Sequence, residues 1–233
     1  MIEVRLDKES WVALAIIAGA RVAKGNEFRN GTQDRGNARN QMNDLVGCVG
    51  EYAAIAASLN AGANVDHDLF YADGPLKKAD LVANGVSFDA KALMLDPSRK
   101  YFILDRQAVA TAADKGIAAF VPVIARCFGN QVLVGNRISI QDASEWPLKD
   151  FGYGEAHARP LSEVTLQYFS KSIEEVLEAI SAEAFGDGAD ETIAAAFAYG
   201  AALKHDGIAV WTEGKDVALA LETLNNQFIK QKS

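Results

Sequence analysis

The dipeptide Asn84-Gly85 separates two strand-like runs by two residues, a spacing typical of a β-hairpin closed by a type I′ turn. Such a turn also sets the pairing register, because each residue before it then has one partner after it. Side chains alternate between the two faces of a strand. The register predicts that Asp80 and Asp89 lie directly opposite each other, with Lys91 on the same polar face. The opposite face is apolar and consists of Leu81, Ala83, Val86, Phe88 and Ala90.

Two facing carboxylates at Asp80 and Asp89 would repel each other unless a cation lies between them. Hard divalent cations such as Mg²⁺ prefer carboxylate oxygens, so a metal ion would convert this repulsion into attraction. Lys91 could then act on a water molecule or a phosphate beside the metal. An ordinary hairpin with a solvated polar face would carry the same residues, so this alternative stays open.

Glu51 is a further acidic candidate, on the helix expected over residues 41–59. It stands alone among Ala, Gly and Ile residues, and a buried carboxylate is costly unless it is paired or bound to a metal. Gly47 and Gly50 on the same helix would allow a close approach to another backbone. The alternatives are a half-exposed Glu51 or one that pairs with a lysine.

Hydrophobic periodicity along the rest of the chain favours a mixed α/β domain with a C-terminal helical extension. We expect an α/β core over residues 1–160 and a helical extension over 161–233 that packs on it. Residues 26–40 and 142–160 are expected to be irregular. The expected helices are 9–24, 41–59, 104–115, 162–184, 190–204 and 214–230, and the expected strands are 65–71, 79–84, 86–95, 117–126 and 131–135.

The set Glu51, Asp80, Asp89 and Lys91, in this order of helix, hairpin, helix and strands, resembles the PD-(D/E)XK nuclease superfamily. The resemblance covers somewhat under half of the chain. It implies a restriction-endonuclease-like fold, a mixed sheet flanked by helices. Ala79 departs from the family pattern, which has proline before the first motif aspartate.

The resemblance also implies an activity, the Mg²⁺- or Mn²⁺-dependent hydrolysis of phosphodiester bonds in DNA. Asp80, Asp89 and the carbonyl group of Ala90 would bind the metal, and Glu51 would complete the site directly or through water. Lys91 would orient or help to deprotonate the attacking water. The metal would act as a Lewis acid and lower the pKa of its bound water.

The distribution of charge along the sequence is relevant to whether DNA is a partner. The formal net charge of −8 argues against one, but residues 141–233 hold 16 acidic and 7 basic residues, whereas residues 1–140 hold 15 acidic and 16 basic ones. Arg29, Arg35 and Arg39 lie in a stretch rich in Asn and Gly. Arginines in a loop of this kind suit phosphate contacts, which supply most non-specific affinity for DNA.

Further expectations concern a helix glutamine, the membrane, the two cysteines and the oligomeric state. Gln107, on the third expected helix, is a candidate for a polar contact with DNA, although an exposed helix glutamine is the alternative. No segment approaches the ~20 apolar residues of a membrane span, and Cys48 and Cys127 form no motif, which favours a reducing, cytoplasmic setting. A homodimer is expected by analogy with nucleases that cut two strands.

Two other classes of function stay open. One is a catalytically inactive nuclease-fold module that binds nucleic acid, or a protein partner through its acidic C-terminal helices. The other is a small α/β interaction protein in which the charged residues of the hairpin are solvated surface residues without a role in function.

Overall fold

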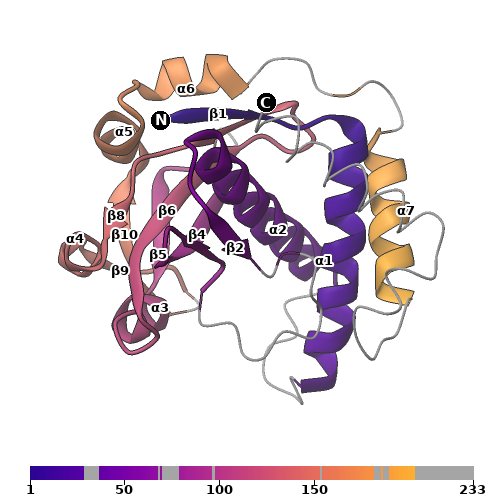
Figure 1. The fold of residues 1–233 in the computed structure, drawn as a ribbon, viewed down its shortest axis with the longest axis horizontal. Helices are drawn as coiled ribbons and strands as arrows, with labels where there is room; N and C mark the ends of the chain where they lie inside the picture. Colours follow the sequence, from indigo (N-terminus) through magenta and orange to yellow (C-terminus); the bar gives the residue numbers. More distant parts are fainter. Residues whose placement is uncertain are drawn as a thin grey trace.

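A curled, mixed seven-stranded sheet forms the centre of the described part of the protein (Figure 1). The computed structural model describes residues 1–28, 37–67, 69, 79–95, 98–152, 154–180, 185 and 189–202. Strand order is β1-β7-β6-β4-β3-β2, with β8 paired to β6, and the β4–β6 pair is parallel. The strands are β1 (Ile2–Arg5), β2 (Val65–His67), β3 (Leu81–Ala83), β4 (Val86–Met94), β6 (Ile117–Ala125), β7 (Gln131–Val134) and β8 (Ile138–Ser139).

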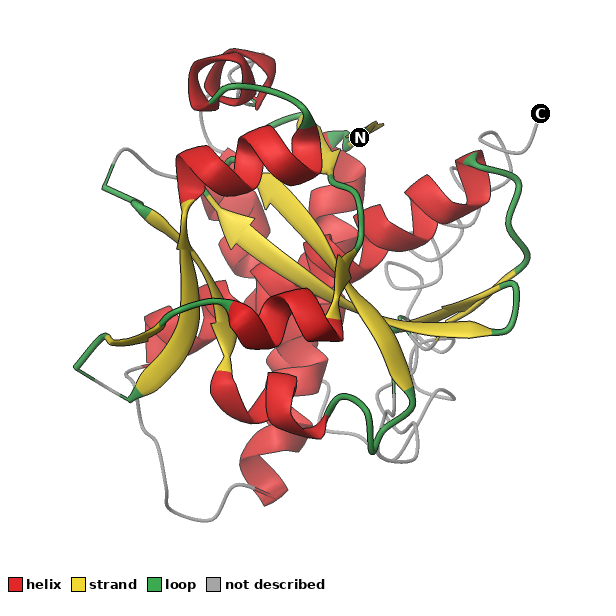
Figure 2. Ribbon diagram, turned by 90° about the vertical axis from the view of Figure 1, so that its left-hand side faces the viewer, coloured by secondary structure: helices red, strands yellow, loops and turns green. Residues whose placement is uncertain are grey.

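Helices cover both faces of this sheet (Figure 2). A smaller antiparallel sheet accompanies them, in the order β5 (Tyr101–Asp105), β10 (Glu155–Pro160) and β9 (Leu148–Asp150). The helices are α1 (Lys8–Phe28), α2 (Asn37–Asn60), α3 (Arg106–Thr111), α4 (Ile140–Glu145), α5 (Leu161–Val164), α6 (Ile173–Ile180) and α7 (Ala189–Ala202), with a π-helical segment over Thr165–Phe169.

Alternation along β4 and β6 divides the apolar residues between two cores. Phe88 and Val121 belong to the core under α1 and α2, whereas Leu93, Phe120 and Ile124 belong to the core under the small sheet and α3 to α6. Because β4 is central, with β3 and β6 as neighbours, its side chains reach into both layers. A polar residue on β4 is therefore held on a strand that is anchored from both sides.

Helix α7 packs on α1 with backbone-to-backbone contact through two glycines (Figure 1). A Cβ atom added at Gly19 would lie 2.1 Å from the Phe197 carbonyl oxygen, and one added at Gly200 would lie 2.1 Å from the Ile16 carbonyl oxygen. Only glycine allows so close a crossing. The division at residue 160 into a core and an extension stays a prediction, but this helix and α1 form one packed unit.

The mixed α/β class predicted from the sequence is confirmed, and so is the hairpin of β3 and β4. The stretch 26–40 is not simply irregular, since α1 continues to Phe28 and α2 begins at Asn37. The stretch 142–160 is also not irregular, because it contains most of α4 and all of β9 and β10. Strands β1 and β5 were not predicted, and the expected helix over 214–230 lies outside the described residues.

The helix expected over 162–184 is interrupted. It is divided into α5, the π-helical segment and α6, and Ser170 between the last two has a φ of +54°. A residue with positive φ ends a right-handed helix. The apolar periodicity continues on both sides of this turn, which is why the sequence pattern resembles one long helix.

Candidate active site

The hairpin has the predicted register. Leu81 pairs with Phe88, and Ala83 pairs with Val86. Asn84 and Gly85 have φ values of +51° and +79°, which are the positive values that a type I′ turn requires. The turn dipeptide therefore determines which side chains of β4 face which side chains of β3.

Asp80 lies one residue before β3, where the ladder with β4 ends. Its amide donates to the Phe88 carbonyl oxygen at 3.1 Å, and its Oδ2 accepts a hydrogen bond from the Ala90 amide at 2.8 Å. The two aspartates are thus not a regular cross-strand pair, which corrects one detail of the expected register. Their carboxyl groups nevertheless lie near enough for each to shift the pKa of the other.

Asp89 and Lys91 lie two residues apart on β4, which pairs with β6 at Phe120 and Pro122. Lys91 Nζ lies 2.7 Å from Asp89 Oδ2, and it is 5.7 Å from the centre of the Phe120 ring. Both side chains are partly exposed, 27% for Lys91 and 22% for Asp89. The ammonium group is therefore fixed beside the carboxyl pair and remains accessible to solvent.

Glu51 reaches the site because α2 approaches β4 closely. A Cβ atom at Gly50 would lie 2.6 Å from Ala92 Cβ, whereas one at Gly47 would meet nothing within 4 Å. The expected close approach is confirmed for Gly50 and wrong for Gly47. Glu51 is buried, with 8% of the residue exposed, and its negative charge contributes to a raised Asp80 pKa.

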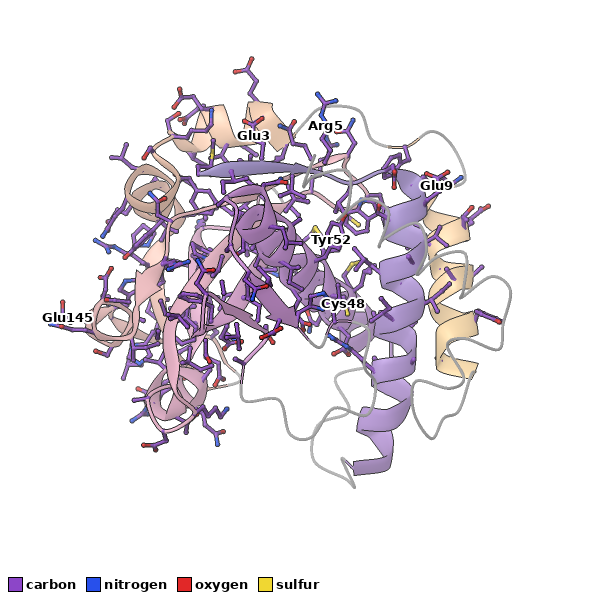
Figure 3. The ribbon with its side chains drawn as sticks, viewed as in Figure 1. Glu3, Arg5, Glu9, Cys48, Tyr52 and Glu145 are labelled. Carbon is purple, nitrogen blue, oxygen red and sulfur yellow. The ribbon has the colours of Figure 1, made fainter. Side chains whose placement is uncertain are left out.

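Arg21 on α1 is a member of the site that the sequence analysis did not identify. Its guanidinium group binds both oxygens of Glu51, with Nη1 to Oε1 at 2.7 Å and Nη2 to Oε2 at 2.8 Å. The same group donates to the Leu69 carbonyl oxygen at 3.1 Å and to Cys48 Sγ at 3.4 Å. Cys48 lies between α2 and α1 in Figure 3. Arg21 directly follows the apolar run of residues 11–20, and this position is the sequence signal for a partly buried charge.

The pKa values of the two aspartates move in opposite directions. Burial raises the Asp80 pKa well above its usual value, and the hydrogen bond to Asp89 and the charges of Glu51 and Asp89 add to this. Burial also opposes ionisation of Asp89, but the hydrogen bond from Asp80 and the charges of Lys91 and Lys115 outweigh it and lower the Asp89 pKa. Of the two aspartates, Asp80 is therefore the one on which protonation is favoured.

The chemistry of the donor groups tests whether a metal ion fits the site. The neighbouring carboxyl groups of Asp80 and Asp89 offer oxygen ligands of the type that Mg²⁺ and Mn²⁺ take. In the described part of the chain, however, no three His, Cys, Asp or Glu side chains form a ready-made metal site. Asp80 and Asp89 thus fit as a two-carboxylate site, and Ala90 lies between Asp89 and Lys91 on β4, paired with Val121.

Of the four residues expected to contact DNA, the structure describes the side chain of Gln107 alone. Arg29 and Arg35 lie outside the described residues, and Arg39 lies on α2 rather than in a loop, with its side chain outside the described part. Gln107 is exposed on α3. Lys115, also missed, is exposed in the turn before β6, and its charge acts on Asp89.

Comparison with known proteins gave no relative. No protein-family model, no curated protein and no solved structure matches the chain. Within the described residues, no helix has the length and apolar character to cross a membrane.

Proposed function

We propose that the protein is a Mg²⁺- or Mn²⁺-dependent deoxyribonuclease with a PD-(D/E)XK-type site on a restriction-endonuclease-like sheet. The observation that carries the proposal is the placement of three side chains: the Asp80 carboxylate accepts a hydrogen bond from the Ala90 amide, and the Lys91 ammonium group lies 2.7 Å from the neighbouring Asp89 carboxylate. A cytoplasmic setting, a homodimer and a protein partner for the C-terminal helices stay predictions.

The balance of charge in the site supports a phosphodiester substrate. With Asp80 protonated, the three carboxyl groups carry two negative charges, and Arg21 and Lys91 compensate them. A divalent cation that replaces the proton would leave one net positive charge. A phosphodiester carries one negative charge, so the loaded site is complementary to it.

In the proposed reaction, Asp80 and Asp89 hold the metal ion, which supplies Lewis acidity and lowers the pKa of bound water. Lys91 donates hydrogen bonds to the attacking water and to the phosphoryl oxygens on which charge develops. The water oxygen bonds to phosphorus and releases a proton to the solvent, one P–O ester bond breaks, and the leaving oxygen takes up a proton. Ala90 contributes its backbone, whose amide keeps Asp80 Oδ2 in place.

Cleavage of supercoiled, linear and single-stranded DNA in Mg²⁺, Mn²⁺ or EDTA tests this function. We expect metal-dependent cleavage that Lys91→Ala lowers by about 10² to 10⁴-fold, as for the loss of a group that acts on the proton or the developing charge. Lys171→Ala, in the turn before α6, is the matched control and retains activity. Cleavage that Lys91→Ala leaves intact would refute the assignment.

A catalytically inactive nuclease-fold module that binds nucleic acid or a protein partner is the second candidate. The two hydrogen bonds from Arg21 to Glu51 favour this candidate, because they leave only the carboxyl groups of Asp80 and Asp89 to bind a metal ion. Such a module would bind DNA without Mn²⁺-dependent cleavage of any of the three substrates.

A further inference from the structure

The Arg21–Glu51 pair has no part in the reaction just described, although it occupies the buried side of the same site. Glu51 and Arg21 come from different helices, α2 and α1, and 11% and 19% of their side chains are exposed. We propose that Arg21 is a positioning residue that keeps Glu51 out of the metal's coordination sphere, so that the metal binds through Asp80 and Asp89 alone among the three acidic side chains. This inference rests on the proposed function.

The geometry of the pair supports this role. The guanidinium group approaches Glu51 with two parallel hydrogen bonds, the bidentate arrangement that gives both strength and orientation. Both carboxylate oxygens of Glu51 are therefore already engaged. For Glu51 to bind a metal through either oxygen, one of these short contacts must lengthen or the carboxylate must accept a second cation.

Arg21 is itself held by groups other than Glu51. Nη2 also donates to the Leu69 carbonyl oxygen, and Nη1 also donates to Cys48 Sγ. These contacts fix the plane of the guanidinium group, so it cannot follow Glu51 toward the metal without losing them. A buried ion pair that loses one partner leaves an uncompensated charge, which is strongly unfavourable.

The consequence concerns the metal's other ligands. With Glu51 retained by Arg21, more coordination positions stay available to water and to phosphate oxygens. Removal of Arg21 would release a carboxylate near Asp80, since the charge of Glu51 already acts on that residue. The released Glu51 would replace one metal-bound water and increase the affinity for the metal.

Mn²⁺ binding without DNA tests this inference through two readouts, the dissociation constant and the number of metal-bound waters from water-proton relaxation. We expect the same number of bound waters in wild type and in Glu51→Gln. Arg21→Gln should bind Mn²⁺ roughly tenfold more tightly, equivalent to about 1.4 kcal/mol, with one water fewer. The double variant Arg21→Gln/Glu51→Gln should return to the wild-type number of waters.

The count of waters separates coordination by Glu51 from a general change of charge, which would alter affinity alone. An additional bound water in Glu51→Gln would show that Glu51 is already a ligand, and an unchanged count in Arg21→Gln would show that Arg21 does not withhold it. Either result overturns the inference. If Arg21→Gln does not fold, Arg21→Lys keeps the charge but not the bidentate contact, and it should also lose one bound water.

Asp80→Asn distinguishes failure of the inference from failure of the proposed function. If wild type binds Mn²⁺ and Asp80→Asn does not, the proposed metal site is supported. The numbers of metal-bound waters then test the role of Arg21 separately. If wild type binds no Mn²⁺, or Asp80→Asn binds it equally well, the metal site and the role of Arg21 are both refuted.

Discussion

At the scale of single residues, the opposite pKa shifts of Asp80 and Asp89 make stability depend on pH in a defined direction. The pKa of Asp80 is raised in the folded protein, so its contribution is fully present below the pKa of an unfolded Asp, about 4, and is lost as pH rises through the folded value. The Asp89 pKa is lowered, so its contribution is present above that unfolded value and is lost as pH falls through the folded value.

We therefore expect the metal-free protein to lose stability as pH rises above about 4 toward neutral, over the window that the raised Asp80 pKa spans. Urea unfolding in EDTA at a series of pH values measures this slope. Asp80→Asn mimics the protonated carboxyl group, since its amide can donate to Asp89 and its oxygen can accept from Ala90. It should reduce the slope and make the protein more stable than wild type at neutral pH, because the asparagine keeps the contribution that wild type loses on ionisation. An unaltered slope in Asp80→Asn would show that another group carries the proton.

The sequence predicted the hairpin members of the site but not the ion pair behind them. Asp80, Asp89 and Lys91 follow from a two-residue turn, because local turn geometry fixes side-chain alternation over several residues. Arg21 and Glu51 meet through the packing of two helices, 30 positions apart in the chain. No local pattern encodes that contact: Glu51 stands alone in an apolar stretch, whereas Arg21 follows an apolar run and has Lys24 three residues after it.

At the scale of elements, the approach of α2 to β4 depends on Gly50. An added methyl group at Gly50 would lie 2.6 Å from Ala92 Cβ, so the helix must move away from the strand. We expect Gly50→Ala to destabilise the protein by about 1–3 kcal/mol, as overpacking does, and to weaken Mn²⁺-dependent cleavage because Ala92 lies on β4, the strand that carries Asp89 and Lys91. Urea unfolding and the cleavage assay measure both effects.

Gly47→Ala is the matched control on the same helix, because nothing lies within 4 Å of its added Cβ atom. It should stabilise the protein by about 0.5–1 kcal/mol through the higher helix propensity of alanine. Equal effects of the two substitutions would contradict the proposed dependence on close packing.

Backbone geometry explains why the sequence pattern did not predict certain elements. Strands β9 and β10 are joined through Gly152 and Gly154, both with positive φ, and this glycine-rich stretch conceals their alternation. The break after the π-helical segment depends on a positive φ at Ser170, a conformation that serine rarely adopts. Tertiary packing fixes these features, so a periodicity analysis gives either a loop or an uninterrupted helix.

At the scale of the whole molecule, α1 connects α7 to the candidate active site. Gly19 contacts α7, and Arg21, two residues later on α1, holds Glu51. Displacement of α7 would thus disturb α1 next to the ion pair. Helix α7 is then part of the support of the site, rather than an independent attachment to it.

Gly200→Ala tests this coupling, because its added methyl group would lie 2.1 Å from the Ile16 carbonyl oxygen and neither backbone can yield without moving a helix. We expect a loss of about 2–4 kcal/mol, at the upper end for overpacked positions. Because α1 and α7 share this contact, helical circular dichroism and tryptophan fluorescence, to which the buried Trp11 on α1 contributes, should report one transition. A separate early loss of helical signal, with tryptophan fluorescence and Mn²⁺ affinity unchanged, would instead show that α7 unfolds independently of the site.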